Sequence, residues 1–165
     1  SVRALCAAAQ DAAQKLGFQC RMLTDCLECE AREAGRFLAS IGRSHQQTER
    51  PLAFFAGGET VVHLTGQGLG GRNQELALAA APGLRGTQNT AVCSFGSDGT
   101  DGPTDAAGGF VDQSSDAALR TAGLDVPQVL AENDAYHALQ RIGGLLMTGP
   151  TGTNVNDLAM VLIWR

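Results

Sequence analysis

The chain has 165 residues and a mass of 17.1 kDa, and its 12 basic and 17 acidic side chains give a formal charge of −5. This length suits one domain, residues 1–165, and the 44% hydrophobic content can fill a core, so wholesale disorder is excluded. There is no basic cluster for a nucleic-acid partner, and no apolar run approaches the roughly 20 residues that a membrane span needs.

The first half of the chain predicts helices that alternate with strands. The predicted helices cover residues 3–17 and 28–44, and the predicted strands cover residues 18–23, 52–56 and 60–64. The opening helix is amphipathic and has no cleavage pattern, so it does not resemble a signal peptide. The last two strands are joined by Gly57-Gly58-Glu59, which is typical of a tight antiparallel hairpin.

The second half of the chain continues the alternation. The predicted helices cover residues 72–81, 114–122, 127–132 and 133–141, and the predicted strands cover residues 90–95, 110–112, 145–148 and 158–164. Pro82-Gly83 is expected to end the first of these helices. Together with the hairpin, the pattern predicts a three-layer α/β/α domain whose mixed sheet contains one antiparallel hairpin.

A glycine-rich loop precedes the helix predicted at residues 72–81. Free backbone N–H groups and Arg72 would meet at the start of this helix, which favours an anion or phosphate site. The candidates for this site are Gly68, Gly70, Gly71, Arg72 and Asn73. The alternative is a helix start with glycines for chain reversal, and the match to the dinucleotide-binding fingerprint is only loose.

Three aspartates follow the strand predicted at residues 90–95. Asp98, Asp101 and Asp105 could bind Mg²⁺ through their oxygens, or one of them could take a proton from a hydroxyl group. We consider Asp101 and Asp105 as metal ligands. Because Asp and Gly are also the commonest turn residues, a purely structural loop remains the alternative.

A third polar loop, residues 148–157, offers hydroxyl, amide and N–H donors to a phosphate or a polyol. Thr151 and Asn154 are its candidate ligands, although the same residues are typical of Asx and Thr turns. None of the three histidines has the spacing of a nucleophilic triad or a metal site.

The five cysteines favour reduced thiols and a cytoplasmic setting, because an odd number does not suit a disulfide framework. Cys26 and Cys29 have the C-x-x-C spacing. Without a second pair or a nearby histidine, two unpaired thiols are the simpler interpretation.

Three motifs in order resemble the C-terminal domain of the glycerate 2-kinases, called the MOFRL domain. They are Gly70-Gly-Arg-Asn-Gln-Glu-Leu-Ala-Leu-Ala79, Asp98-Gly-Thr-Asp-Gly-Pro-Thr-Asp-Ala-Ala-Gly108 and Thr148-Gly-Pro-Thr-Gly-Thr-Asn-Val-Asn-Asp157. The resemblance runs from the first predicted helix to the last predicted strand, with further support from Glu30-Ala-Arg-Glu33 and Asn133-Asp-Ala-Tyr136. Cys29 departs from the family, which commonly has Gly there.

The resemblance implies ATP-dependent phosphorylation of D-glycerate to 2-phosphoglycerate, with Mg²⁺ or another divalent cation. By motif position, the functional arginine and aspartate of the family fall on Arg72 and Asp98. The family's site lies in a cleft with a Rossmann-like N-terminal domain, which brings a functional lysine and is missing from this chain. Lys15 is predicted on an outer helix and cannot replace that lysine, so the chain alone is expected to be inactive.

Two other functions remain open from the sequence. The chain could be a non-catalytic ligand-binding or subunit module that uses the same loops. It could also be a hydroxypyruvate reductase, an older label in the same family, although the dinucleotide fingerprint is incomplete.

Overall fold

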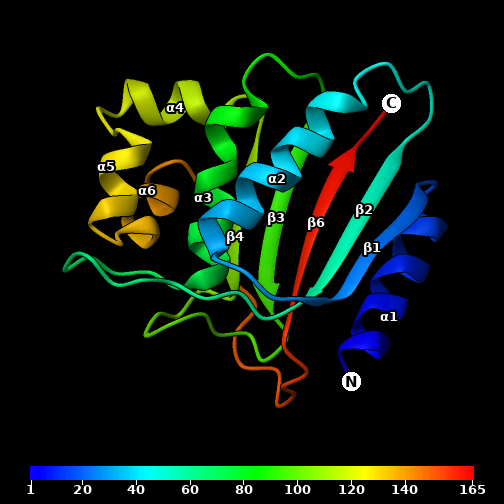
Figure 1. The fold of residues 1–165 in the computed structure, drawn as a ribbon, viewed down its shortest axis with the longest axis horizontal. Helices are drawn as coiled ribbons and strands as arrows, with labels where there is room; N and C mark the ends of the chain where they lie inside the picture. Colours follow the sequence, from blue (N-terminus) through cyan, green and yellow to red (C-terminus); the bar gives the residue numbers. More distant parts are fainter.

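Six strands form a mixed sheet in the order β1-β2-β6-β3-β4-β5 in the computed structural model, which describes residues 1–165 (Figure 1). The strands are β1 Gln19–Leu27, β2 Leu52–Gly58, β3 Thr90–Gly96, β4 Gly108–Asp112, β5 Leu145–Leu146 and β6 Asp157–Ile163. β1 is parallel to β2, whereas β6 is antiparallel to both of its neighbours, β2 and β3. As a result β1, β2 and β3 all end at the edge of the sheet where β6 begins.

Helices lie on both faces of the sheet, so the predicted three-layer α/β/α arrangement is confirmed. The helices are α1 Val2–Lys15, α2 Ala31–Ser44, α3 Arg72–Leu84, α4 Ser115–Thr121, α5 Val126–Ala131 and α6 Ala135–Arg141. The main core lies between the sheet and α2 to α6, and a smaller core lies under α1. In Figure 1, α2 and α3 cross the sheet, α4 to α6 flank α3, and α1 lies beside β1.

The strand β2 shows why the sheet needs cover on both sides. All seven of its residues are buried. Leu52 and Phe54 pack in the main core, while Ala53 and Phe55 pack in the smaller core under α1. A strand that is apolar on both faces is typical of the middle of an α/β sheet.

The hairpin predicted between residues 52–56 and 60–64 is wrong. Residues 60–64 form no strand, and Val61 makes only an isolated parallel bridge with Glu30. Both edges of β2 are already occupied, by β1 on one side and β6 on the other, so no edge remains for a returning strand. Consecutive strands pair in antiparallel fashion at β3 and β4 instead.

The end of α3 also differs from the prediction, because the helix continues through Pro82 to Leu84. Proline removes one backbone N–H and normally ends a helix. Here the final turn places Leu84, which is fully buried, in the main core. Burial of this side chain favours the extra turn over an earlier end.

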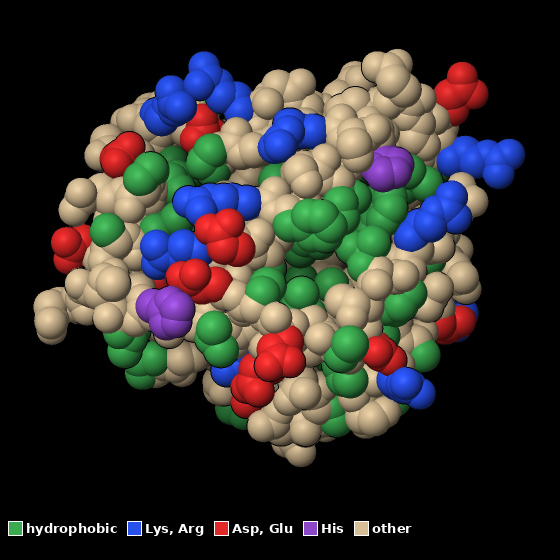
Figure 2. Space-filling model, viewed as in Figure 1, with side chains coloured by type: hydrophobic (Ala, Val, Ile, Leu, Met, Phe, Trp, Pro, Cys, Tyr) green, Lys and Arg blue, Asp and Glu red, His purple; other side chains and the backbone are tan.

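The surface over α2 and α3 carries basic and acidic side chains that are intermixed, so positive charge does not gather into one broad patch on this face (Figure 2). No helix of the chain combines the length and the apolar character that crossing a bilayer requires.

Candidate active site

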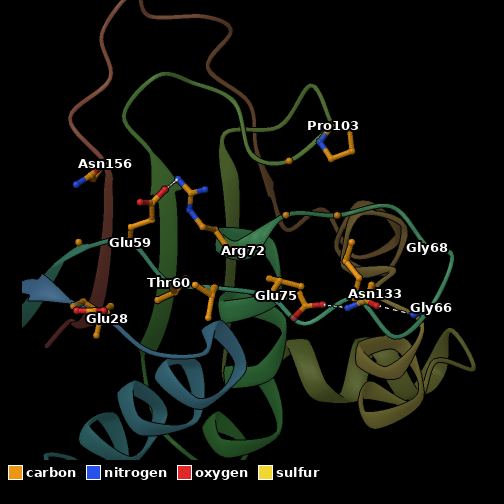
Figure 3. Close-up of a pocket in the computed structure, with 18 of the residues that line it drawn as sticks. Glu28, Glu59, Thr60, Gly66, Gly68, Arg72, Glu75, Pro103, Asn133 and Asn156 are labelled. Carbon is orange, nitrogen blue, oxygen red and sulfur yellow. Dashed lines mark hydrogen bonds and ion pairs between the residues drawn. The ribbon is translucent and has the colours of Figure 1, made fainter.

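A hollow of about 1010 Å³ opens at the edge of the sheet where β1, β2 and β3 end. Its walls come from the end of β1, the loop from β2 to α3, the first turns of α3 and the loop after β3. Figure 3 shows ten labelled lining residues: Glu28, Glu59, Thr60, Gly66, Gly68, Arg72, Glu75, Pro103, Asn133 and Asn156. The carboxyl ends of parallel strands are the usual place for a ligand in an open α/β sheet.

The loop from β2 to α3 is held in place by the side chain of Asn133. Its Oδ1 accepts hydrogen bonds from the backbone N–H groups of Thr65 (2.6 Å) and Gly66 (2.8 Å). Its Nδ2 donates to the carbonyl oxygen of His63 and, at 2.8 Å, to Oε1 of the buried Glu75. The dashed lines of Figure 3 connect Glu75, Asn133 and Gly66 in this way. One residue of the polar corner between α5 and α6 therefore fixes the wall of the hollow.

The glycines of this loop are needed for close packing as well as for the hollow. A Cβ atom at Gly66 would lie 2.3 Å from the Cα atom of Glu132, and one at Gly71 would lie 2.5 Å from the Cγ atom of Asp101. Gly66, Gly68, Gly70 and Gly71 nevertheless all line the hollow. The predicted phosphate-binding glycines are thus at the site, although packing alone would require at least two of them to be glycine.

The N-terminus of α3 is occupied by the side chain of Asp101. Its carboxylate accepts hydrogen bonds from the backbone N–H groups of Asn73 (3.1 Å) and Gln74 (2.9 Å), and from both of their side-chain amides. Burial raises the pKa of Asp101, although these hydrogen bonds act in the opposite direction. The N–H groups that were expected to bind an external anion are therefore used by an internal one, and Asn73 is buried beneath it.

The residues present do not fit the metal site expected at Asp101 and Asp105. Both oxygens of Asp101 accept hydrogen bonds, and Asp105 is an exposed side chain that accepts from the Tyr136 hydroxyl group at 2.7 Å. No group of three or more His, Cys, Asp or Glu side chains is placed to hold a metal ion. The sequence placed the two aspartates four positions apart, but one of them faces inward and the other outward.

Arg72 is the first residue of α3 and lies against two carboxylates. Its Nε and Nη2 atoms donate to the two oxygens of Asp157, at 2.5 and 3.1 Å, and Nη2 also lies 3.2 Å from Oε1 of Glu59. In Figure 3 the side chains of Arg72 and Glu59 point toward each other. The hydrogen bond with Asp157 raises the pKa of Arg72 further above its ordinary value. The arginine is thus a fixed cation at the hollow.

Asp98 lies near Asp157, the partner of this arginine, although it does not line the hollow itself. The space left by the missing side chain of Gly96 is bordered by Oδ1 of Asp98 and Oδ1 of Asp157, which would lie 3.1 and 3.5 Å from a Cβ atom there. Oδ1 of Asp98 accepts a hydrogen bond from the N–H group of Thr100, whereas Oδ2 has no partner in the chain. One oxygen of Asp98 is therefore free for a ligand.

The third predicted loop, residues 148–157, packs against the loop that carries Asp98. Thr151 donates its N–H to the carbonyl oxygen of Asp98, at 3.1 Å, and its hydroxyl to the carbonyl oxygen of Ser97. The Ser97 hydroxyl in turn accepts from the N–H group of Val155. Asn154 is exposed and turns its Oδ1 to the N–H group of Asn156, so Asn156 and not Asn154 lines the hollow. The three loops meet at one edge of the sheet.

Four carboxylates line the hollow and the sequence analysis missed all of them: Asp25, Glu28, Glu59 and Glu75. Arg72 is the one basic residue among the lining residues. Asp157 was part of the third motif, but nothing in the motif showed that its partner would be Arg72, 85 positions earlier. An anion that enters this hollow gains attraction from Arg72 and repulsion from its acidic rim, so it needs further positive charge from elsewhere.

The comparisons with known proteins agree on the family, although two relatives from Agrobacterium vitis, 41% and 40% identical, are named putative hydroxypyruvate reductases. Residues 52–157 match the model of the MOFRL family. A D-glycerate 2-kinase from Thermotoga maritima is 54% identical over 167 residues, which cover 99% of this chain, and a glycerate 2-kinase from Pyrococcus horikoshii is 45% identical over 163 residues, which cover 96%. The crystal structure of a glycerate kinase from Thermotoga maritima superimposes with a TM-score of 0.94 over 99% of this chain.

The match covers only part of each relative. The chain spans 40% of the length of the Thermotoga maritima kinase and 37% of the Pyrococcus horikoshii kinase. It also spans 40% of the chain in the crystal structure.

Proposed function

Because the chain belongs to the MOFRL family, we propose that it is the C-terminal part of an ATP-dependent glycerate 2-kinase that converts D-glycerate to 2-phosphoglycerate. The observation that carries the proposal is the meeting of the three motif loops at the edge of the sheet where the hollow with Arg72 opens. The names of the Thermotoga maritima and Pyrococcus horikoshii relatives support the activity. Their greater lengths support an N-terminal domain that this chain does not include. The five free cysteines suit the reducing setting of the cytoplasm, which we propose as the location.

In this proposal Arg72 binds negative charge on the substrate. Its guanidinium is fixed by Asp157 and is partly exposed in the hollow, so it can donate to the glycerate carboxylate or to the phosphoryl group in transfer. Gly68, Gly70 and Gly71 line the same hollow. Asn73 and Asp101 are buried behind them and contribute by fixing the start of α3.

Asp98 is the proposed acceptor for the proton of the attacking hydroxyl group. The C2 hydroxyl of glycerate would attack the terminal phosphorus of ATP, its O–H proton would pass to Oδ2 of Asp98, and ADP would leave. A carboxylate in this role also orients the hydroxyl group for in-line attack. Thr151 supports Asp98 through its backbone contact, while Asn154 is exposed outside the hollow and could contact a substrate only through its side-chain amide N–H groups.

The rest of the site is proposed to come from the part of the protein that this chain lacks. The acidic rim and the single arginine cannot by themselves hold the charge of ATP, so further cationic groups must be added. Phosphoryl transfer depends almost wholly on such positioned charge. Because the described residues provide no site for a divalent cation, no step here is assigned to one.

Transfer of phosphate to D-glycerate tests the proposal. The chain alone is compared with a chimera in which it replaces the matching region of the Thermotoga maritima kinase, and formation of 2-phosphoglycerate from D-glycerate and ATP is measured. We expect turnover by the chimera and none by the chain alone. A chimera that folds but transfers no phosphate would favour a non-catalytic binding module, and oxidation of NADH by either protein with hydroxypyruvate would favour a reductase.

A further inference from the structure

We infer that Asp157 is a positioning residue, which fixes the orientation of the Arg72 guanidinium and leaves its Nη1 group free for an anionic substrate. Asp157 does not line the hollow, whereas Arg72, to which it is hydrogen-bonded, does. The inference rests on the proposed function for the identity of the substrate, but not for the orientation of the arginine.

The backbone of Asp157 is anchored on both sides. It is the first residue of β6, and it pairs with Gly58 of β2 on one side and with Gly96 of β3 on the other. A strand bonded to two neighbours cannot shift at this position without disturbing both ladders. The Asp157 carboxylate therefore offers Arg72 a fixed partner.

The Asp157 side chain is more deeply buried than the Arg72 side chain, as a positioning role requires. The Asp157 side chain is 8% exposed, whereas the Arg72 side chain is 35% exposed. The carboxylate lies beneath the guanidinium, and the guanidinium forms the boundary with the hollow. A charge pair with one buried partner is oriented more strictly than an exposed pair, because the buried carboxylate has no water to replace the arginine.

The hydrogen bonds account for one edge of the guanidinium only. A guanidinium has five N–H donors: one on Nε and two on each terminal nitrogen. Asp157 takes the Nε donor and one Nη2 donor, and Oε1 of Glu59 forms an ion pair with Nη2 at 3.2 Å. Nη1 has no partner in the chain, so its two donors remain for a carboxylate or phosphoryl oxygen in the hollow.

Glu59 alone cannot fix the orientation of the Arg72 guanidinium. It lies on the loop after β2, its side chain is 56% exposed, and it contacts only Nη2. An exposed single contact of this kind is weak and is screened by salt. Only Asp157 accepts hydrogen bonds from two nitrogens of Arg72, and two such contacts in one plane prevent the guanidinium from rotating.

NMR spectroscopy of the arginine side chains tests the inference in this chain. Rotation about the Nε–Cζ bond exchanges Nη1 with Nη2, and its rate is measured in the wild type and in Asp157→Asn, with Arg72→Lys to assign the signals. Inorganic phosphate is then titrated into each protein. We expect exchange to be about tenfold faster and phosphate binding about tenfold weaker in D157N, because a charge-assisted bidentate contact is lost.

Asp116→Asn is the matched control. Asp116 is also a buried aspartate paired with an arginine, since its side chain is 4% exposed and its Oδ2 lies 3.0 Å from Nε of Arg120, but it is on α4 and outside the hollow. This variant should lose stability without changing the Arg72 exchange rate or phosphate binding. If D157N does not fold, Asp157→Glu, which keeps the charge but displaces the carboxylate, is measured in the same way with the same expectation.

Two results would overturn the inference: unchanged exchange at Arg72 in the Asp157 variant, or phosphate binding that is equal in the variant and the wild type. A wild-type Arg72 signal that does not respond to phosphate would also overturn it, because Nη1 would then not be available. Failure of the chimera to phosphorylate D-glycerate would refute the proposed kinase function and leave the exchange measurement standing.

Discussion

Replacement of Asp101 by alanine is expected to be the most destabilising change in the loop after β3. The carboxylate accepts four hydrogen bonds from Asn73 and Gln74, and it is 3% exposed, so water cannot take its place. Hydrogen bonds to a charged group contribute about 1.5–3 kcal/mol each, but bonds that share one acceptor do not add. We therefore expect a loss of about 3–5 kcal/mol in the free energy of unfolding, a large part of the 5–15 kcal/mol of a typical domain.

Urea unfolding followed by circular dichroism measures this loss, and Asp105→Ala is the matched control. Asp105 is in the same loop, but it is exposed and accepts only one hydrogen bond, from Tyr136. Its replacement should cost less than about 1 kcal/mol. Equal losses in the two variants would refute the role given to Asp101. An increase in wild-type stability on addition of MgCl₂, absent in Asp101→Ala, would show instead that Asp101 binds a metal.

Three further results are expected. The stability advantage of the wild type over Asp101→Ala should fall as pH rises from about 3.9 and then level off, because burial holds the pKa of Asp101 in the folded protein above its value in the unfolded chain. An advantage that grows with pH in urea titrations would contradict this. Asn133→Ala removes the side chain that holds the loop from β2 to α3, so it should lower the free energy of unfolding by about 2–4 kcal/mol and increase amide hydrogen exchange at residues 63–66. Unchanged exchange at these residues would show that Asn133 does not hold the loop. At pH 8 iodoacetamide should modify the exposed Cys26 before Cys6 and Cys93, because burial raises the pKa of both thiols, that of Cys93 to about 12. Mass spectrometry of the digested protein measures the order, and equal rates at the three cysteines would contradict it.

The layered fold could be predicted because hydrophobic periodicity is a local property. Every helix and all but one of the predicted strands occur in the structure, with shifted ends. The exception, residues 60–64, has the apolar alternation of a strand, but the neighbours of β2 leave it no edge to pair with. The order of the strands in the sheet depends on the whole chain, so it cannot be read from any short segment of the sequence.

The candidate site was predictable as a set of loops but not as a set of contacts. Glycine and aspartate content, together with the position of the loops after strands, indicated correctly which edge of the sheet they share. The partner of each charged residue was not predictable, because Arg72 meets Asp157 and Asp101 meets the start of α3 only after the chain has folded. The sequence therefore indicated an open anion site at the N-terminus of α3. In the structure the carboxylate of Asp101 occupies this site.

The claim that these loops carry phosphoryl transfer is tested most directly by Arg72→Lys in the chimeric kinase. Lysine keeps the positive charge, so Asp157 is not left as a buried unpaired carboxylate, but it cannot donate along two edges at once. We predict that kcat/KM for D-glycerate falls by about 100-fold while the free energy of unfolding changes by about 1 kcal/mol, and that Arg120→Lys on α4 leaves kcat/KM unchanged. Equal values of kcat/KM in the Arg72 and Arg120 variants would contradict the account.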